Sequence, residues 1–333
     1  MAGIVVGFSA NPEEHVVFEG SLPEGVTARV NHDFYDVRGG GSSFNIHKAV
    51  AGAGIASMLF VPVGYSPDGK LDFNREQMDH ILSGMSAIRL PLRDRHSSRA
   101  TILCPVDGPG GRILAHKPPI LQDRVPEAVE KICGHLRNQE PEFLVMTGIM
   151  EDELPLARTF IEHGKDGEGR MVFAPHASLV KSGKARELLP MANYLFLSAI
   201  ESQELLGKGM TLQELQGFCR EHGLELVSVS NGKRGLWIAT PEDAFRIPEL
   251  PFDGTIIDPT GAGDAVISGM LISFLKGHNS VRTAALQGAA HARLVCTKIG
   301  GSSVPSWDKV EQLADAVRSV VKFDTNGSFS TSP

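Results

Sequence analysis

The segment DPTGAGD, residues 258–264, places an aspartate directly after three consecutive small residues. Because Gly261, Ala262 and Gly263 carry little or no side chain, their backbone N–H groups can turn toward one cluster of negatively charged oxygens. The run that follows, residues 265–277 (AVISGMLISFLKG), predicts a helix whose N-terminal dipole also favours an anion. The segment is therefore predicted to bind a phosphoryl group.

Asp264 would lie in the first turn of that helix, where its carboxylate could take a proton from a hydroxyl nucleophile. With the amides of Gly261, Ala262 and Gly263 holding the transferring group, the segment would supply both the base and the anion cradle of a phosphoryl transfer. An alternative is that the small residues only make a tight strand-to-helix turn, with Asp264 as an ordinary N-terminal acid of the helix.

A second glycine-rich segment, GGSSFN at residues 40–45, precedes an alanine-rich stretch that ends in glycine, residues 49–54. Gly40 and Gly41 would let a substrate approach the backbone closely, and the Asn45 amide can both donate to and accept from a pair of sugar hydroxyls. Asn45 is therefore a candidate substrate contact. The alternative is a glycine-rich loop with an asparagine in a helical first turn.

Short apolar runs alternate with amphipathic stretches along most of the chain. The strands and helices that this pattern predicts would position the two glycine-rich segments. Continuous hydrophobicity predicts strands covered on both faces at residues 4–8, 58–61, 143–146, 171–173, 194–197 and 226–229. Apolar residues at three- and four-residue spacing predict helices at residues 125–136, 152–163, 212–222 and 281–295. This order predicts an α/β fold, a doubly wound and mostly parallel sheet flanked by helices.

Two regions depart from this alternation, one from about residue 14 to 37 and one from about residue 88 to 116. Their short strand-like runs predict antiparallel strands with one face toward solvent, which together could form a small β lid over one edge of the main domain. Residues 1–323 are then expected to form a single α/β domain that includes the lid. The polar tail, residues 324–333 (DTNGSFSTSP), is expected to be disordered.

The composition of the chain limits the classes of partner that it can bind. Of the 333 residues 21% are charged, and the net charge of −7 argues against a nucleic-acid partner, whose phosphates need a concentrated basic face. The apolar stretches are too short to span a bilayer, the N-terminus lacks the pattern of a secretory signal, and the four cysteines include no CxxC pair. We therefore expect a cytoplasmic protein that acts on small molecules and does not bind membranes.

The DPTGAGD and GGSSFN segments resemble the two signatures of the ribokinase-like, or PfkB, carbohydrate kinase family, and the resemblance continues in motif order from about residue 4 to residue 307. It implies a ribokinase-like sandwich with a β lid, in which Asp264 is the catalytic base and the glycines form the anion hole. The family resemblance also implies ATP as the phosphoryl donor and Mg²⁺ as a cofactor. Lids of this kind pair edge to edge, so a homodimer is a further expectation.

The segment NPEEH, residues 11–15, resembles the NPxxD of the family branch that contains 1-phosphofructokinase and tagatose-6-phosphate kinase. The resemblance implies that Asn11 and residue 15 contact the sugar, although His15 replaces the Asp; the alternative for His15 is a surface lid residue. Arg99 matches a lid arginine that binds the phosphate of a sugar phosphate, whereas Ser42 replaces a lysine with the same role. The alternative for Arg99 is a solvated strand residue.

The expected reaction is therefore transfer of the γ-phosphoryl group of ATP to a hydroxyl of a sugar phosphate, of the fructose 1-phosphate, fructose 6-phosphate or tagatose 6-phosphate type. A kinase of an unphosphorylated sugar or polyol is the alternative. The departures from the family pattern at His15, Ser42, Ser66 and Ser198 leave a third and less favoured alternative, a sugar-binding or regulatory relative without activity.

Glu201 follows an apolar strand and resembles the Glu of the NxxE motif that orders Mg²⁺ through water. Ser198 stands in place of the Asn of this motif. Because Mg²⁺ keeps most of its waters, we expect weaker metal ordering rather than none. The alternative role for Glu201 is a capping acid on a helix from Ser202 onward.

The segment SNGKRG, residues 230–235, resembles the family turn beside the nucleotide, which makes Ser230, Gly232 and Gly235 candidate nucleotide contacts. Taken alone, the segment is also an ordinary glycine-containing hairpin turn. Thr260 is a further candidate beside the nucleotide. The backbone oxygens of Asp258 and Thr260 are a candidate site for K⁺, as in some relatives.

Overall fold

Two sheets carry the fold in the computed structural model, which describes residues 3–18, 35–65, 73–94, 96–105, 112–137, 139–164, 169–207 and 211–325. The main sheet has nine strands in the order β13-β12-β11-β10-β9-β8-β1-β4-β5. These strands are β1 (Ile4–Phe8), β4 (Ser57–Tyr65), β5 (Ala87–Asp94), β8 (Phe143–Thr147), β9 (Arg170–Ala174), β10 (Tyr194–Ser198), β11 (Leu226–Ser230), β12 (Leu236–Ala239) and β13 (Ala244–Ile247).

In the main sheet, β5, β4, β1, β8, β9, β10 and β11 pair parallel, each with the next in this order. At the end of the sheet, β12 pairs antiparallel with both β11 and β13. Every residue of β1 and of β8 is buried, because helices cover both faces of the sheet. The predicted doubly wound, mostly parallel sheet is therefore confirmed.

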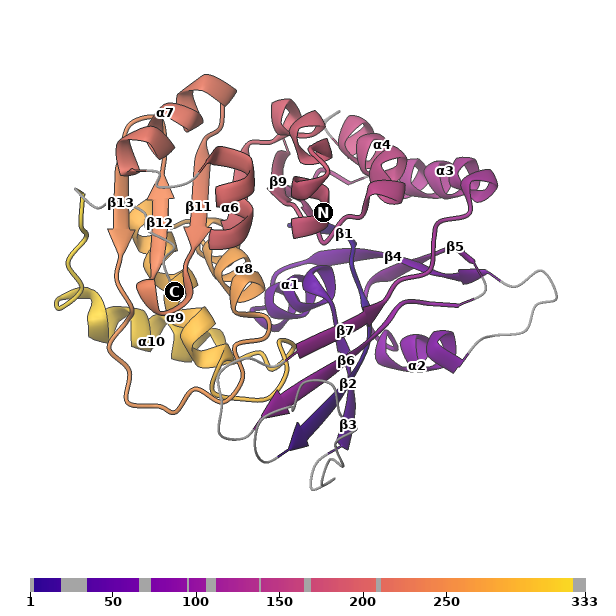
Figure 1. The fold of residues 1–333 in the computed structure, drawn as a ribbon, viewed down its shortest axis with the longest axis horizontal. Helices are drawn as coiled ribbons and strands as arrows, with labels where there is room; N and C mark the ends of the chain where they lie inside the picture. The colour runs from indigo at the N-terminus through magenta and orange to yellow at the C-terminus, as the bar shows by residue number, and fades with distance from the viewer. Residues whose placement is uncertain are drawn as a thin grey trace.

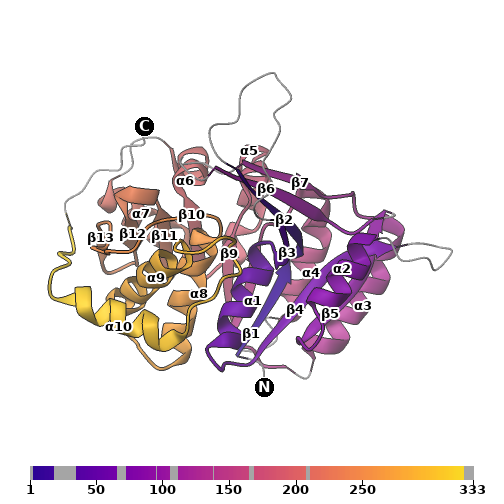
Figure 2. The same ribbon diagram turned by 90° about the horizontal axis from the view of Figure 1, so that it is seen from below.

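Helices form a layer on each face of the main sheet (Figures 1 and 2). One layer contains α1 (Ser42–Gly52), α2 (Phe73–Ile81), α8 (Ala262–Leu275), α9 (Val281–Val295) and α10 (Trp307–Arg318). The other contains α3 (Val125–Leu136), α4 (Leu154–Gly164), α5 (Ala177–Lys181), α6 (Ala199–Leu206) and α7 (Leu212–His222). The bounds of α3, α7 and α9 agree with the sequence prediction.

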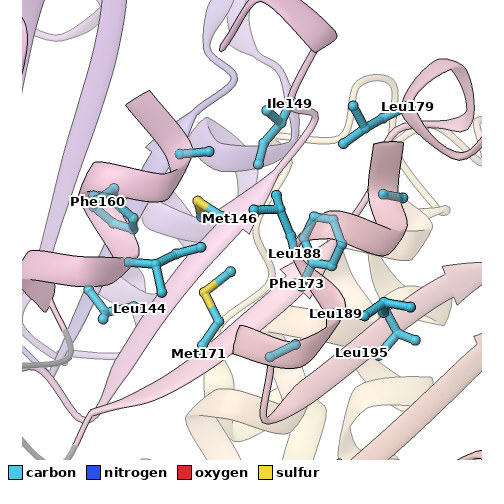
Figure 3. Close-up of a cluster of buried hydrophobic side chains, with 14 of the residues drawn as sticks. Leu144, Met146, Ile149, Phe160, Met171, Phe173, Leu179, Leu188, Leu189 and Leu195 are labelled. Carbon is cyan, nitrogen blue, oxygen red and sulfur yellow. The ribbon is translucent and has the colours of Figure 1, made fainter. Parts of the chain in front are cut away.

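The two layers enclose two separate apolar cores, since successive side chains of a strand point to opposite faces of the sheet. In β8, Leu144 and Met146 join the core under α3 to α7, whereas Phe143 and Val145 join the core under α1, α8, α9 and α10. Figure 3 shows the first of these cores, where Met146 and Phe173 from the sheet lie among side chains of the covering helices.

α8 is the most deeply packed of these helices, with an uninterrupted buried run from Ala265 to Ser273. It begins at Ala262, three residues before the predicted start, because Gly261 adopts φ 79° and serves as its N-cap. A methyl group on Gly269 would come within 2.8 Å of the Gly288 Cα, so α9 can approach α8 closely only because both positions are glycine. This packing fixes the N-terminus of α8 at the candidate site.

The second sheet has the order β3-β2-β6-β7 and lies beside α1 and α2 (Figure 1). Its strands are β2 (Asn11–Phe18), β3 (Tyr35–Gly40), β6 (Arg99–Pro105) and β7 (Arg112–His116). The predicted lid ranges, 14–37 and 88–116, differ from this sheet in two places: β2 begins at residue 11, and residues 88–94 belong to β5 of the main sheet. β5 lies at an edge and is partly exposed, which explains why its sequence alternates. Residues 19–34 and 106–111 lie outside the described residues.

The C-terminal end of the described chain returns to the main sheet. Asp324 pairs with Arg246 of β13 through two backbone hydrogen bonds of 2.8 and 3.1 Å, so the first residue of the predicted tail is part of the fold. Residues 326–333 lie outside the described residues. No helix in the described part of the chain is long and apolar enough to cross a membrane.

Candidate active site

The N-terminus of α8 presents backbone donors to the site. The amide of Ala262 donates to Pro259 O at 3.1 Å, whereas the amides of Gly261, Gly263 and Asp264 donate to no described residue. Such first-turn amides, together with the helix dipole, bind anions. The open donors of the predicted cradle are therefore Gly261 and Gly263, joined by Asp264 itself.

A second loop holds this helix N-terminus in place. The buried Asp258 carboxylate accepts hydrogen bonds from Thr260 N at 2.9 Å and from Gly300 N at 2.8 Å, which ties the segment before α8 to the loop before α10. A methyl group on Gly261 would lie 2.4 Å from the Gly301 Cα, so these loops also pack directly on one another. Both carboxylate oxygens of Asp258 are thus engaged in hydrogen bonds with backbone amides, which leaves only the backbone oxygen of this residue for the predicted cation.

Asp264 faces α1. Its Oδ2 accepts a hydrogen bond of 2.8 Å from Asn45 Nδ2, across 219 residues of sequence. The surrounding protein removes water from the carboxylate and raises the pKa of Asp264 to about 6, while hydrogen bonds from Asn45 and Ser42 lower it; the charges of Glu13 and Glu201 raise it further. A carboxylate with a raised pKa is a better proton acceptor near neutral pH than an exposed aspartate.

The glycines of GGSSFN make room for a residue that the sequence analysis did not single out. Glu13 Oε1 accepts a hydrogen bond from Gly41 N at 2.8 Å, and a methyl group on Gly40 would lie only 1.8 Å from the Glu13 Cδ. Gly41 has φ 88° and forms the N-cap of α1, which carries Asn45. Because Gly40 has no side chain, the Glu13 carboxylate can occupy the space beside it.

The face of β2 that carries Glu13 also carries His15, since both are buried and lie two residues apart in the strand. His15 Nε2 lies 3.5 Å from Glu13 Oε2, and the ring packs against Gly300. The alternative of a surface lid residue is therefore excluded for His15. Asn11 is half-buried at the start of β2, where its Nδ2 donates to Pro12 O at 3.2 Å.

Arg99 lies apart from this group. In the parallel register of β2 and β6, Glu13 is opposite Ala100 and His15 is opposite Ile102, and both partners are buried. Arg99 is exposed and, one position away in β6, lies on the other face of the second sheet. The structure does not bring it to Asp264.

Glu201 lies at the carboxyl end of β10 and caps α6. Its Oε2 accepts a hydrogen bond from Ser198 N at 2.7 Å, and the Ser198 hydroxyl accepts one from Glu201 N at 3.3 Å. The helix begins at Ala199 rather than after Ser202, and the capping role left open by the sequence is present. The charge of Glu201 also raises the pKa of Asp264.

The candidate nucleotide contacts lie in the turn between β11 and β12. This turn is closed by a hydrogen bond of 2.9 Å from Asn231 N to Gly235 O. Gly235 has φ 88°, and a methyl group there would lie 2.0 Å from Ile247 O, so its close packing on the end of β13 requires glycine. Gly232 is exposed, and the Ser230 hydroxyl donates to Leu197 O at 3.4 Å.

Comparison with known proteins decides the family. The family model for "pfkB family carbohydrate kinase" matches residues 18–309. The chain belongs to the pfkB family of carbohydrate kinases. The assignment made from the sequence motifs is thereby confirmed.

Curated relatives match parts of the chain. A nucleoside kinase from Methanocaldococcus jannaschii is 29% identical over 147 residues, which are 43% of this chain and 47% of that protein. The chain spans about half or less of the length of the curated relatives that it matches.

Solved structures share the whole fold. Phosphofructokinase-2 from Escherichia coli in complex with potassium has a TM-score of 0.74 at 14% identity, covering 95% of this chain and 99% of its own. A ribokinase from Thermotoga maritima has a TM-score of 0.70 at 20% identity, covering 95% of this chain and 100% of its own. The predicted ribokinase-like sandwich is therefore confirmed.

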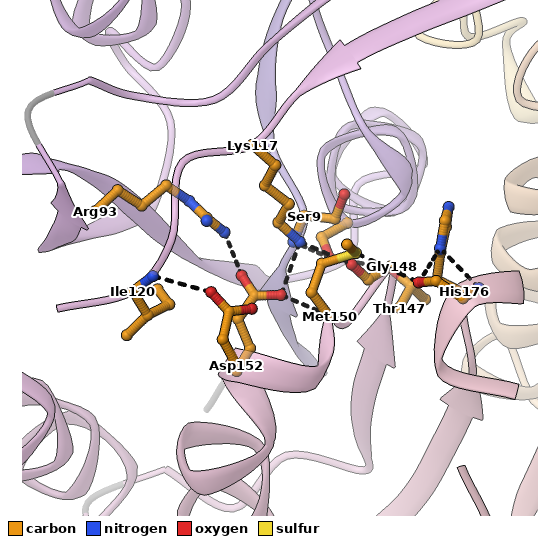
Figure 4. A network of polar contacts seen from close by, with 12 residues as sticks. Ser9, Arg93, Lys117, Ile120, Thr147, Gly148, Met150, Asp152 and His176 are labelled. Carbon is orange, nitrogen blue, oxygen red and sulfur yellow. Dashed lines mark hydrogen bonds and ion pairs between the residues drawn. The ribbon is translucent and has the colours of Figure 1, made fainter. Parts of the chain in front are cut away.

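Charged residues that the sequence analysis missed surround the carboxyl ends of β8 and β9 in this pfkB chain (Figure 4). Fully buried Glu153 pairs with Arg93 and with Lys117, whose Nζ lies 2.7 Å from Glu153 Oε2 and also donates to Gly148 O at 3.0 Å. His176 caps α5 nearby, and its pKa is lowered by burial and by Lys117. No local motif indicates these residues, because the network joins segments that are separate in sequence.

Proposed function

We propose that this pfkB protein is an ATP-dependent kinase that transfers the γ-phosphoryl group to a hydroxyl of a carbohydrate or polyol. The observation that carries the proposal is the position of Asp264, a carboxylate with a raised pKa directly beside the open amides of the α8 N-terminus. A base and an anion cradle at one helix N-terminus are what phosphoryl transfer to an alcohol requires.

In the proposed reaction, the acceptor hydroxyl loses its proton to Asp264 while its oxygen attacks the γ-phosphorus. The bond from phosphorus to the bridging oxygen breaks, and ADP leaves. The amides of Gly261 and Gly263 stabilise the transferring group, and the Asn45 amide orients the base through Oδ2.

Glu201 would hold Mg²⁺, directly or through water, since Ser198 fixes its carboxylate at the edge of the sheet. The ion would neutralise charge on the triphosphate. Any K⁺ near Asp258 would be bound by backbone oxygens, because both carboxylate oxygens of Asp258 accept backbone hydrogen bonds. The likeness to a potassium complex of phosphofructokinase-2 supports this part of the proposal.

The geometry favours an unphosphorylated acceptor. Arg99, the predicted phosphate ligand, lies on the other face of the second sheet, whereas Glu13 brings a carboxylate to the side of Asn45 and Asp264, where it would accept a hydrogen bond from an acceptor hydroxyl. The nucleoside kinase among the relatives and the ribokinase among the structures are named for unphosphorylated acceptors, whereas phosphofructokinase-2 is named for a phosphorylated one.

A sugar phosphate of the fructose 1-phosphate, fructose 6-phosphate or tagatose 6-phosphate type remains a second candidate. Lys117 favours it, because this cation lies at the carboxyl end of β8, where Gly148 packs on Ser9 next to β2. Lys117 pairs with Glu153 there and would be the cation that contacts a remote phosphate.

Among the described strands, β3 and β7 end the second sheet without a further strand paired to them, which supports the expected homodimer through the lid. Light scattering of the purified protein tests this part of the proposal, with a monomer at all concentrations as the contrary result. The expected cytoplasmic location stays a prediction.

The decisive experiment measures ATP-dependent ADP release with matched acceptors: ribose and ribose 5-phosphate, fructose and fructose 6-phosphate, fructose 1-phosphate, tagatose 6-phosphate, adenosine and myo-inositol. At least one unphosphorylated acceptor should be turned over. Asp264→Asn should then lower kcat by about 10² to 10⁴ while the Kd for ATP stays nearly unchanged. A variant that keeps most of its turnover would remove Asp264 as the base, and ADP release only with phosphorylated sugars would favour the second candidate.

A further inference from the structure

Two chain connections join the β6–β7 half of the second sheet to the main sheet, and a basic residue lies at the root of each. Arg93 lies near the carboxyl end of β5, before the chain enters β6, and Lys117 follows directly after β7. The Arg93 side chain is 1% exposed and that of Lys117 is 19% exposed. Charges buried to this extent need an anion beside them, because an unpaired charge is costly to bury.

Glu153 supplies that anion for both cations. Its Oε1 pairs with the Arg93 guanidinium, and its Oε2 lies 2.7 Å from Lys117 Nζ and accepts from Met150 N at 2.8 Å. The Arg93 guanidinium also donates to the backbone oxygen of Pro118, the residue after Lys117. Figure 4 shows Arg93 and Lys117 reaching this place from two separate segments. One buried carboxylate therefore holds both connections.

Backbone hydrogen bonds complete this tie between the sheets. The amide of Leu121 donates to Leu92 O at 2.7 Å, which pairs the connection that leaves β7 with the end of β5. Asp152 Oδ2 accepts from Ile120 N at 2.9 Å, so the same connection is also fixed to the turn that carries Glu153. Because β2 pairs with β6 along its length, holding β6 and β7 at their roots also holds β2.

Lys117 extends the tie to the candidate active site. Its Nζ donates to Gly148 O at 3.0 Å, at the carboxyl end of β8. The residue before this glycine, Thr147, shares a hydrogen bond of 2.9 Å with the hydroxyl of Ser43 in the first turn of α1. The same helix carries Asn45, which bonds the proposed base. Lys117 thus fixes the second sheet relative to the helix that orients this base.

We infer that Lys117 is a positioning residue of the proposed kinase: by bridging Glu153 and the Gly148 carbonyl, it keeps the second sheet against the site and keeps water from replacing the acceptor hydroxyl. The inference rests on the proposed function and goes beyond it, because it assigns the choice between acceptor and water to an ionic contact away from the reacting atoms. In the reaction with water, the water oxygen attacks the γ-phosphorus and Asp264 takes its proton. The bond from phosphorus to the bridging oxygen breaks, and ADP and inorganic phosphate leave.

Lys117→Met tests the inference, because methionine keeps an apolar chain at this place and removes the ammonium group. The fold should survive, since Glu153 keeps its bonds to Arg93 and to the Met150 amide. With ATP and Mg²⁺, the ratio of inorganic phosphate release to transfer onto the best unphosphorylated acceptor should rise at least about tenfold. The KM for the acceptor should rise, and the KM for ATP should stay the same. Lys117→Arg, which keeps the charge, should bring the ratio back toward that of the unmodified protein.

Lys131→Met is the matched control. Lys131 also donates to a backbone oxygen of β5, Arg89 O at 2.8 Å, but from the exposed face of α3. This variant should leave the ratio and both KM values unchanged. Should Lys117→Met not fold, Asp152→Ala serves as the second variant, since it breaks the bond to Ile120 N and leaves both ion pairs of Glu153 in place. The ratio should rise in the same direction.

The ratio decides between a positioning role and two others. A general loss of stability would lower phosphate release and transfer together, so an unchanged ratio in Lys117→Met would overturn the inference while leaving the kinase function intact. A cation that only binds the phosphate of a sugar phosphate would matter for phosphorylated acceptors alone. A change confined to ribose 5-phosphate and fructose 6-phosphate would therefore contradict the inference, whereas no turnover of the whole panel by the unmodified protein would overturn the kinase function.

Discussion

Asp264 joins two properties at the scale of single residues: it keeps a hydrogen bond to Asn45, and it lies where the protein removes water from its carboxylate. The first property fixes the direction of the oxygen, and the second makes the carboxylate more basic. The charges of two further carboxylates, Glu13 and Glu201, also raise the pKa of Asp264. Proton transfer to Asp264 is therefore coupled to the charge of the other two.

The pKa of Asp264, raised from 3.8 to about 6, predicts the pH dependence of turnover. Only the ionised carboxylate accepts a proton, so kcat/KM should be level above pH 6 and fall about tenfold per pH unit below it. Initial rates between pH 5 and 8 measure this, with recovery of activity at pH 7.5 after incubation at pH 5 as the control for unfolding. A profile that stays level down to pH 4.5 would contradict it.

At the scale of elements, the site depends on the first turn of α8. Gly261 must be glycine because of its φ of 79° and its contact with Gly301, whereas a methyl group on Gly263 would meet no atom of the described residues within 4 Å. The space above Gly263 is where the proposed phosphoryl group would lie. We therefore expect that glycine is needed at 263 for the proposed ligand and at 261 for the fold.

Gly263→Ala tests this difference. The methyl group should leave the melting temperature unchanged or slightly higher, because alanine favours a helix, but kcat/KM should fall at least roughly tenfold since the cradle is filled. The matched control is Gly217→Ala in α7, another exposed helical glycine with no neighbour within 4 Å of the added methyl. It should gain about 0.5–1 kcal/mol of stability without a loss of activity. A fully active Gly263→Ala would argue against the cradle.

At the scale of the whole molecule, two buried histidines connect the helical layer of the site to its neighbours. His47 of α1 lies 2.7 Å from Ser57 Oγ at the start of β4, and His291 of α9 lies 3.3 Å from Ser268 Oγ of α8. Burial lowers the pKa of each from 6.5 to about 4. The folded protein therefore holds both rings neutral where the unfolded chain would protonate them.

This predicts acid destabilisation. The folded state binds fewer protons than the unfolded chain below pH 6.5, so the free energy of unfolding should decrease as pH falls from 6.5 toward 4, by up to about 3 kcal/mol for each histidine. Asp264 acts in the opposite sense, because its raised pKa favours the folded state as pH falls through 6.

Urea unfolding at pH 7 and pH 5 measures the net effect. His47→Gln and His291→Gln should each reduce the difference between the two pH values. An exposed histidine, His163→Gln, serves as the control and should not change it. Equal stability of the unmodified protein at both pH values would refute the prediction.

Much of the architecture follows from local patterns in the chain. The periodicity of residues 125–136, 212–222 and 281–295 gives the bounds of α3, α7 and α9, because each of these helices carries its own apolar face and its own ends. The sequence also identified Asp264 and Asn45 separately, since each belongs to a short motif whose residue types indicate chemistry.

Tertiary structure decided which of these residues meet. The bond between Asn45 and Asp264, the burial of Glu13 and His15 and the outward position of Arg99 all depend on the register of β2 and β6 and on loops far apart in sequence. A shift of one residue in a strand moves a side chain to the opposite face. The family could therefore be predicted from the sequence, whereas the charges around Asp264 are set by packing between distant segments.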